Sequence, residues 1–129
     1  MQRHSANYTD AFIEAAEDCP AVTGTVPPGA KARAEYDMLY GNPYLHTCDD
    51  VIYAVYGKPK GISRDEFFSK GQPCLRASPL TKRYGWGIHC DGGGRIAVYA
   101  VDSPEYRSFA ADRNLRHLRA MRNGKSGPR

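Results

Sequence analysis

The chain lacks the features that mark membrane, secreted and nucleotide-binding proteins. No apolar run approaches the roughly 18 residues that a membrane-spanning helix needs, so we expect no membrane partner. The N-terminal residues Met1 to Ser5 are polar and show no apolar core of a signal peptide, which favours a cytoplasmic location. Neither a Gly-x-Gly-x-x-Gly nor a Gly-x-x-x-x-Gly-Lys-Ser/Thr motif occurs, and we expect no cofactor.

Cysteine is sparse, and its spacing carries little information. The four cysteines are far apart and form no Cys-x-x-Cys pair, so without a secretion signal we expect reduced thiols. A zinc site would form only if folding brought residues 46–50 (His-Thr-Cys-Asp-Asp) to residues 89–91 (His-Cys-Asp). Polar residues are common at the ends of strands, so the sequence favours no metal site.

What remains is the composition of one globular domain. The chain has 129 residues, of which 41% are hydrophobic and 11% aromatic, and this excludes a disordered chain. The net charge of +4 is uneven: residues 107–129 hold seven lysines and arginines and one acid, a net of +6, which leaves −2 for the rest. We therefore predict a single domain over residues 1–129 with a basic end, of which 123–129 is disordered.

The first helix is predicted near residues 8–18. Asn7 suits the N-cap, and Asp10 lies in the first turn, where an acid is favourable. Pro20 limits the helix. The apolar residues then recur at helical spacing, at Tyr8, Phe12, Ala15, Ala16 and Cys19.

Two further helices are predicted near residues 30–40 and 103–121. The first of them carries an apolar stripe of Ala32, Tyr36, Leu39 and Tyr40. Gly41 suits the left-handed position after its end, and the Asn-Pro pair at 42–43 prevents its continuation. Ser103, followed by proline and glutamate, is a typical start for the second. The apolar spacing slips near Arg113 and then resumes, which indicates one helix to about 112 and a kinked or separate helix to about 121.

The first strand is predicted near residues 50–56, where Val51 to Tyr56 are apolar or aromatic on both faces. Such a pattern suits a strand that is covered on both sides. Gly57 and Pro59 end it.

A hairpin is predicted over 84–90 and 95–101, with residues 91–94 (Asp-Gly-Gly-Gly) as its turn. A two-residue or a four-residue loop places Trp86 opposite Tyr99. Two glycines of the first strand then share one face and leave a trough, into which a helix or a ligand could fit. The expected fold class is α+β: one antiparallel sheet of these three strands, with helices packed on it.

The segments 67–80 (FFSKGQPCLRASPL) and 82–89 (KRYGWGIH) resemble blocks of a bacterial family of small proteins of unknown function. Residues 16–20, 42–44, 49–51, and 100–101 with 105–106 resemble further blocks, so the likeness covers most of the chain, from Asn7 to Met121. The resemblance implies single-domain cytosolic proteins with no assigned activity, cofactor or catalytic residues. The family more often has serine at the place of Cys48, which weakens a metal role for that thiol.

The leading functional hypothesis is a small-ligand or anion site in the block 70–89. Its loop is rich in Gly and Pro, and arginine and lysine suit the binding of a phosphate or carboxylate. A small anionic ligand is therefore the expected partner. The candidate ligand-binding residues are Lys70, Gln72, Arg76, Lys82, Arg83 and His89.

Two other functions remain open. An enzyme could use Cys74 as a nucleophile, with His89 as its base if the fold brings them together. An interaction module could use the basic C-terminal helix, on which Arg113, Arg116 and Arg119 recur at every third residue. The overall charge is too low for a dedicated nucleic-acid-binding protein. The sequence leaves a homo-oligomer open.

Overall fold

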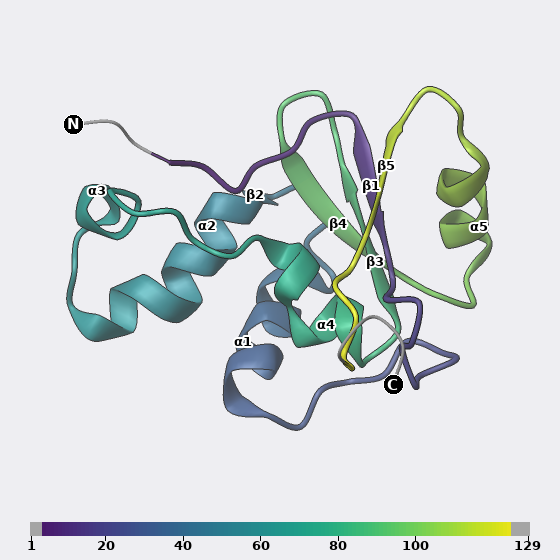
Figure 1. The fold of residues 1–129 in the computed structure, drawn as a ribbon, viewed down its shortest axis with the longest axis horizontal. Coiled ribbons are helices and arrows are strands. Elements are labelled where there is room, and N and C mark those ends of the chain that lie inside the picture. The colour runs from purple at the N-terminus through teal and green to yellow at the C-terminus, as the bar shows by residue number, and fades with distance from the viewer. Residues whose placement is uncertain (1–3, 125–129) are drawn as a thin grey trace.

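The computed structural model describes residues 4–124 and shows a single α+β domain built on one mixed sheet (Figure 1). The five strands lie in the order β2-β4-β3-β1-β5. All neighbours are antiparallel except β1 and β5, which are parallel, so the expectation of a purely antiparallel sheet was wrong. The strands are β1 Ala11–Glu14, β2 His46–Thr47, β3 Trp86–Cys90, β4 Arg95–Ala100 and β5 Arg116–Arg119.

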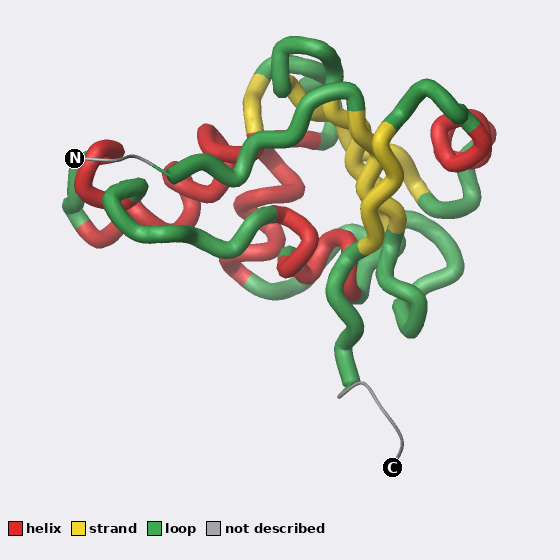
Figure 2. Tube along the Cα trace, turned by 45° about the horizontal axis from the view of Figure 1, so that its top comes forward, coloured by secondary structure: helices red, strands yellow, loops and turns green. Residues whose placement is uncertain are grey.

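The helices cover the two faces of the sheet unequally. Helices α1 to α4 lie together on one side, and α5 lies alone on the other (Figure 2). No helix among residues 4–124 is long and apolar enough to cross a membrane. The helices are α1 Ala30–Leu39, α2 Cys48–Ile52, the π-helix η1 Tyr53–Gly57, the 3-10 helix η2 Lys58–Lys60, α3 Arg64–Phe67, the 3-10 helix η3 Leu75–Ala77, α4 Pro79–Lys82 and α5 Pro104–Ala111.

The predicted helix 30–40 is confirmed as α1. Its buried face carries Ala32, Tyr36 and Leu39, three residues of the predicted apolar stripe, whereas the fourth, Tyr40, is exposed. Gly41 follows the helix with a φ of +82°, which an L-residue adopts only with strain. Local signals are sufficient here because the stripe, the end of the helix and the following Asn-Pro pair all agree.

The predicted helix 8–18 is wrong, because this segment forms β1. Ala11, Phe12 and Ile13 are all fully buried, since β1 is an inner strand covered on both faces. A strand of this kind is apolar throughout, and its apolar residues fit helical spacing by coincidence. Asn7 caps no helix; its side-chain carbonyl accepts a hydrogen bond from the Asp49 amide at 2.9 Å.

The predicted strand 50–56 is wrong as well, because the chain is helical from Cys48 to Lys60. Thr47 and Asp50 form a capping box, in which each side chain accepts from the other residue's backbone amide. The apolar run is buried on two sides as a helix: Tyr53 contacts Phe67, with the ring centroids 5.8 Å apart. A short apolar run does not distinguish a buried helix from a buried strand.

The predicted hairpin is confirmed as β3 and β4, but its register differs by one residue. Trp86 lies opposite Ala100, and the pair Cys90–Ile96 closes the ladder. The turn contains an extra residue, with Gly94 at a φ of +81°, which produces a bulge. A shift of one residue moves a strand's side chains to the other face, so Tyr99 lies on the α5 side of the sheet.

The trough expected beside the glycines is filled by helix α5. A Cβ atom on Gly87 would lie 2.5 Å from the Tyr106 ring and 2.8 Å from that of Phe12. The absence of a side chain therefore lets α5 approach the sheet closely. Gly85 precedes the strand at a φ of +80° and lies against the backbone of Thr23.

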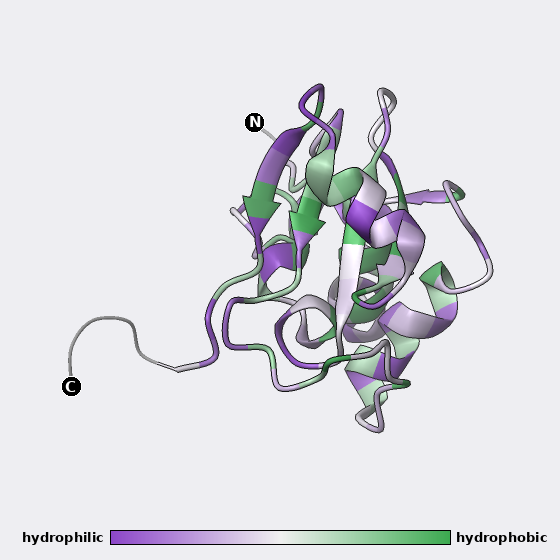
Figure 3. Cartoon of the chain, turned by 90° about the vertical axis from the view of Figure 1, so that its right-hand side faces the viewer, coloured by the Kyte–Doolittle hydropathy of each residue, from purple (hydrophilic) through white to green (hydrophobic). Residues whose placement is uncertain are grey.

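The predicted helix near 103–121 ends at Ala111. Ser103 caps α5 as expected, with its hydroxyl accepting from the Tyr106 amide at 3.1 Å. Asp112 then forms a turn by accepting from the Asn114 amide at 2.8 Å. The chain continues as β5, a strand at the edge of the sheet whose first residues are strongly hydrophilic (Figure 3). The predicted second helix was therefore wrong.

The end of the chain is only partly described. Of the segment 123–129 that was expected to be disordered, residues 125–129 lie outside the described residues. The Asn123 and Gly124 amides both donate to the Asp18 carboxylate, at 3.0 Å. These hydrogen bonds lower the pKa of Asp18 to about 2.

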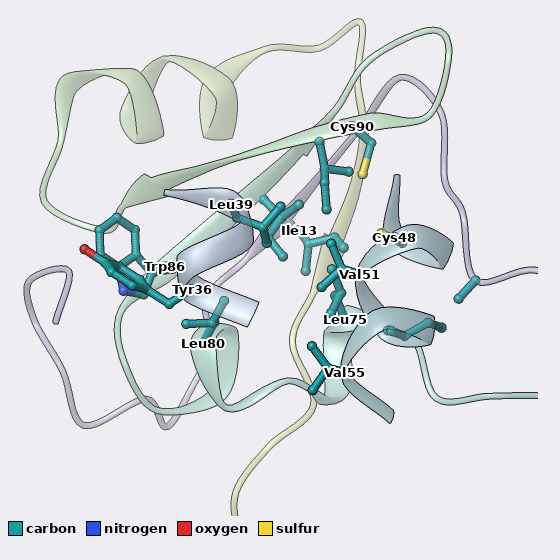
Figure 4. Packing of buried hydrophobic residues seen from close by; sticks show 14 of the residues in the cluster. Ile13, Tyr36, Leu39, Cys48, Val51, Val55, Leu75, Leu80, Trp86 and Cys90 are labelled. Carbon is teal, nitrogen blue, oxygen red and sulfur yellow. The ribbon is translucent and has the colours of Figure 1, made fainter. Parts of the chain in front are cut away.

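The main core lies between the sheet and helices α1 to α4 (Figure 4). Ile13 and Trp86 contribute from the strands, Leu39 from α1, and Val51 from α2. Cys48 and Cys90 meet inside it, and all four cysteines are free thiols.

Candidate functional site

A pocket of about 330 Å³ lies among the helices, where α1, α2, η1 and η3 meet. A pocket of this size suits a small molecule rather than a macromolecule. Its lining combines an apolar wall with a few polar groups: Glu35, Ile52, Tyr56, Lys60, Phe67, Gln72, Pro73, Cys74, Leu75, Ala77 and Ser78.

Glu35 is the unusual member of this lining. Its residue is only 1% exposed, although a glutamate is rarely buried without a basic partner. It lies on α1 between Ala32 and Leu39, on the helix face that packs into the protein. Two hydroxyl groups hold it: Ser78 donates to one carboxylate oxygen at 2.5 Å, and Tyr56 donates to the other at 3.0 Å.

Ser78 is held in place by the start of helix α4. Its hydroxyl oxygen accepts a hydrogen bond from the Leu80 amide at 3.0 Å, as a helix cap does. Its proton is donated to Glu35, because a carboxylate oxygen can only accept. Ser78 is therefore both a structural cap and a donor to the buried carboxylate.

Tyr56 reaches the pocket from the π-helical turn η1. A π-helical turn contains one residue more than an α-helical turn, and such turns are frequent at functional sites. Gly57 follows in the close contact with α3, where a Cβ atom would lie 2.8 Å from the Phe67 ring. The tight packing of this segment thus fixes the direction in which Tyr56 points.

The burial of this group changes its acid–base chemistry. Desolvation raises the pKa of Glu35 above its ordinary value, although the hydrogen bonds from Ser78 and Tyr56 act in the opposite direction. The pKa of Tyr56 is raised by burial and by the nearby charge of Glu35, so Tyr56 keeps its proton and donates it. A carboxyl with a raised pKa that borders a pocket is a typical candidate for a binding or acid–base role.

The polar groups elsewhere in the lining are less constrained. Cys74 lies 3.3 Å from the Tyr8 hydroxyl, in a partly buried position. Gln72 donates to the Phe67 carbonyl at 2.7 Å, which orders the loop that closes this side of the pocket. Lys60 is exposed at the end of η2.

The six residues predicted to bind a ligand do not converge. Gln72 lines the pocket, whereas Lys70 and Arg83 are exposed elsewhere. Arg76 donates to the Arg119 carbonyl at 2.7 Å and so ties η3 to β5. Lys82 ends α4, and its carbonyl accepts from Asn123 at 2.7 Å.

The sixth predicted residue, His89, lies on the α5 side of the sheet. Its ring stacks on Phe109 with the centroids 4.1 Å apart, and its Nδ1 atom lies 2.8 Å from the Tyr44 hydroxyl. Burial lowers its pKa below the ordinary histidine value. Cys90, the next residue of β3, faces the opposite layer, so the sheet separates His89 from the layer that contains Cys74.

Among the residues that it describes, the structure does not contain the arrangements that the other two functional hypotheses required. His89 and Cys74 do not form the nucleophile–base pair that the enzyme hypothesis required. Arg113, Arg116 and Arg119 do not share a helical face, because this segment is a turn and a strand. Within residues 4–124, no three metal-ligating side chains come together.

Sequence reasoning missed Glu35, Tyr56 and the role of Ser78. One signal was available: Glu35 stands three residues after Ala32 and four before Leu39, so the predicted apolar stripe of α1 contained an acid. An acid inside an apolar stripe predicts either a buried partner or a functional carboxyl. The positions of Tyr56 and Ser78 beside it depend on the tertiary fold and could not be read from spacing.

The comparisons with known proteins give one result. A model described as "Family of unknown function (DUF6157)" matches residues 3–126. The chain belongs to this family. No curated protein and no solved structure matches the chain. Membership of DUF6157 assigns no reaction or ligand, so the pocket around Glu35 is the feature from which a function can be inferred.

Proposed function

We propose that this DUF6157 protein is a small-ligand-binding domain whose ligand occupies the pocket at Glu35. The observation that carries the proposal is a buried carboxylate, 1% exposed, that borders a pocket of about 330 Å³ and has only hydroxyl partners among residues 4–124. Burying a charged carboxylate costs free energy. An uncharged residue at position 35 could hold Tyr56 and Ser78 together without that cost. A ligand group that binds Glu35 would offset this cost.

The remainder of the lining supports the same function. Ile52, Phe67 and Leu75 form an apolar wall, and the polar groups are few. Sites for small ligands usually combine apolar walls with a small number of placed polar groups that fix the ligand's orientation. The ligand therefore has an apolar body and one group that binds Glu35.

The remaining sequence-based expectations become part of this proposal. An anionic group on the ligand would meet Lys60, the basic residue among those that line the pocket. A cytoplasmic location and a bacterial origin are also part of the proposal, and they are supported by the resemblance of the sequence blocks to a bacterial family. They are independent of the pocket.

The test uses three probes of nearly equal size and different charge: benzylamine, benzyl alcohol and benzoate. Binding is followed by two-dimensional 1H–15N NMR on the full chain. We expect at least one probe to shift the amide signals of residues 72–78. Ala77→Phe fills the pocket and should abolish this binding, whereas Ala111→Phe, on the exposed end of α5, should leave it intact.

The outcome against the proposal is equally specific. If none of the probes shifts these signals, or if Ala77→Phe binds a probe as well as the wild type does, the pocket is not a ligand site. Both variants introduce the same side chain, so a general effect of an added phenylalanine would appear in both.

A further inference from the structure

We propose that the ligand is a small amine whose ammonium group pairs with Glu35, an inference that rests on the proposed function. Whether the pocket favours an amine, a neutral donor or an anion depends on the charge of its lining. That charge is set by the Glu35 carboxylate, its two hydroxyl partners and the nearby lysines.

The first step is the missing counter-charge. The ion pairs of residues 4–124 join other acids to arginine or histidine, and none of them includes Glu35. A carboxylate buried without a cation is costly, and a hydroxyl offsets less of that cost than a charged donor does. A cationic ligand supplies the charge that the protein does not.

The second step is the hydrogen-bonding capacity of the carboxylate. A carboxylate offers about four acceptor positions, and Ser78 and Tyr56 use one on each oxygen. The Ser78 hydroxyl uses its one proton on Glu35, and its oxygen accepts from the Leu80 amide, so Ser78 has no donor left for a ligand. The free capacity at this end of the pocket is therefore that of an acceptor, which an ammonium with three donors fits.

The third step is the position of the lysines. Lys60 lines the pocket but is exposed, and Lys31 is exposed with its ammonium 5.0 Å from the centre of the Tyr56 ring. Water and salt screen exposed charges strongly, whereas a buried carboxylate is screened much less. The repulsion between the exposed lysines and a bound cation is therefore weaker than the attraction between that cation and the buried carboxylate of Glu35.

The apolar wall sets the remainder of the ligand. Phe67, Leu75 and Ile52 border the space beyond Glu35. An ammonium group on a short apolar or aromatic body would pair with the carboxylate and bury that body against these side chains. Benzylamine has this chemistry and serves as the probe.

The experiment compares dissociation constants of benzylamine, benzyl alcohol and benzoate by NMR titration at neutral pH. We expect benzylamine to bind at least about tenfold more tightly than benzyl alcohol, as a charge-assisted contact predicts. Glu35→Gln should remove this preference, because it weakens the binding of benzylamine far more than that of benzyl alcohol. The matched control is Glu105→Gln, an exposed acid on α5, which should keep the wild-type preference.

Two further variants ensure that the test does not depend on Glu35→Gln alone. Glu35→Asp keeps the charge but draws it back by one methylene, so benzylamine should bind severalfold more weakly and remain preferred. Lys60→Met removes the exposed cation and should strengthen benzylamine binding slightly. Amide spectra of every variant establish that it is folded before its affinity is compared.

The results that overturn the inference differ from those that overturn the proposed function. Equal binding of benzylamine and benzyl alcohol, or a preference for benzylamine that persists in Glu35→Gln, excludes the amine. Tight binding of benzoate that is lost in Lys60→Met shows an anion site instead. In these cases the pocket still binds a ligand, whereas the absence of any binding contradicts the proposed function itself.

Discussion

The two sides of the sheet are built in different ways. On the α5 side, aromatic rings fill the layer: Phe12 contacts Tyr106 and Phe109, with centroids 5.0 and 5.5 Å apart, and Phe109 also stacks on His89. The glycine at 87 lets this helix lie close to the strands. This side is a packing surface whose polar atoms mainly hold structure in place.

On the other side, several short helices leave a pocket and bury a carboxylate. Here Glu35 joins α1 to Tyr56 and Ser78, which lie far from it in the sequence. The comparison shows where the fold accepts a cost. The residues beneath α5 pack closely, whereas the layer of α1 to α4 contains a buried carboxylate that has no ion-pair partner among residues 4–124, which is typical of functional sites.

The largest effect on stability is expected from adding a side chain at Gly87, where α5 lies close to the sheet. Gly87→Ala should lower the free energy of unfolding by about 3 kcal/mol, because its Cβ would overlap the rings of Tyr106 and Phe12. Gly71→Ala, whose Cβ would meet only His4 among residues 4–124, at 3.9 Å, should change it by less than about 0.5 kcal/mol. Urea unfolding measures both, and equal values would show that α5 does not pack as described.

A tyrosine on each side allows the same substitution to be compared. The Ala15 amide donates to the Tyr106 hydroxyl at 2.9 Å in a buried position, so Tyr106→Phe leaves that amide unpaired and should cost about 2 kcal/mol. Tyr56→Phe should cost less than about 1 kcal/mol, because water in the pocket can take over its hydrogen bond to Glu35.

Thermal and urea unfolding of the two variants test the contrast. A larger cost for Tyr56→Phe would mean that the pocket side is as rigidly packed as the α5 side. The wild-type protein and a double variant provide the check for additivity, since the two sites share no partner.

A smaller effect is expected at the hairpin turn that sets the register. Gly94 has a φ of +81°, so Gly94→Ala should cost about 1 kcal/mol through backbone strain. Gly93→Ala is the matched control, because its Cβ would find only the Asp91 side chain, at 3.6 Å. If both variants unfold at the same urea concentration, the bulge that sets the Cys90–Ile96 pairing is absent.

The smallest effect on stability, and one of opposite sign, is expected for Glu35→Gln. Burial raises the pKa of Glu35 in the folded protein, so the folded state binds this proton more tightly than the unfolded state does. Wild-type stability therefore decreases as the pH rises from the unfolded pKa through the folded pKa of Glu35. The variant lacks this decrease and should be more stable than the wild type at neutral pH.

The measurement is the difference in unfolding free energy between wild type and Glu35→Gln from pH 4 to pH 8. Tyr56 and Ser78 face the carboxyl from η1 and from the start of α4, and Lys60 and Cys74 line the same pocket. The lowered pKa values of Asp18 and Asp50 act in the opposite direction, but they are common to both proteins and cancel. A difference that is constant across this range would contradict a raised pKa of Glu35.

Local signals in the sequence predicted part of this fold. Helix α1, the Ser103 cap and the β3–β4 hairpin were found because their spacing, caps and turn residues agree. For β1 a helix was predicted and for α2 a strand. The apolar residues of β1 fit helical spacing by coincidence, and the apolar run that begins in α2 shows no helical period.

The candidate site was harder to predict than the fold. Gln72 was predicted and lines the pocket, but the basic residues around it bind backbone groups or lie in solvent. The pocket joins residues 35, 56 and 78 through tertiary contacts that no spacing encodes. The acid within the stripe of α1 was the available clue, and its hydroxyl partners appear only in three dimensions.

The central claim is that an amine binds beside Glu35, on the side of the sheet opposite α5. Intermolecular NOEs from benzylamine to the protein test it most directly, because they identify the side chains that touch the probe. We expect NOEs to the methyl groups of Ile52 and Leu75 and to the ring of Phe67. NOEs to Phe109 or Tyr99 instead would place the amine beneath α5 and contradict the claim.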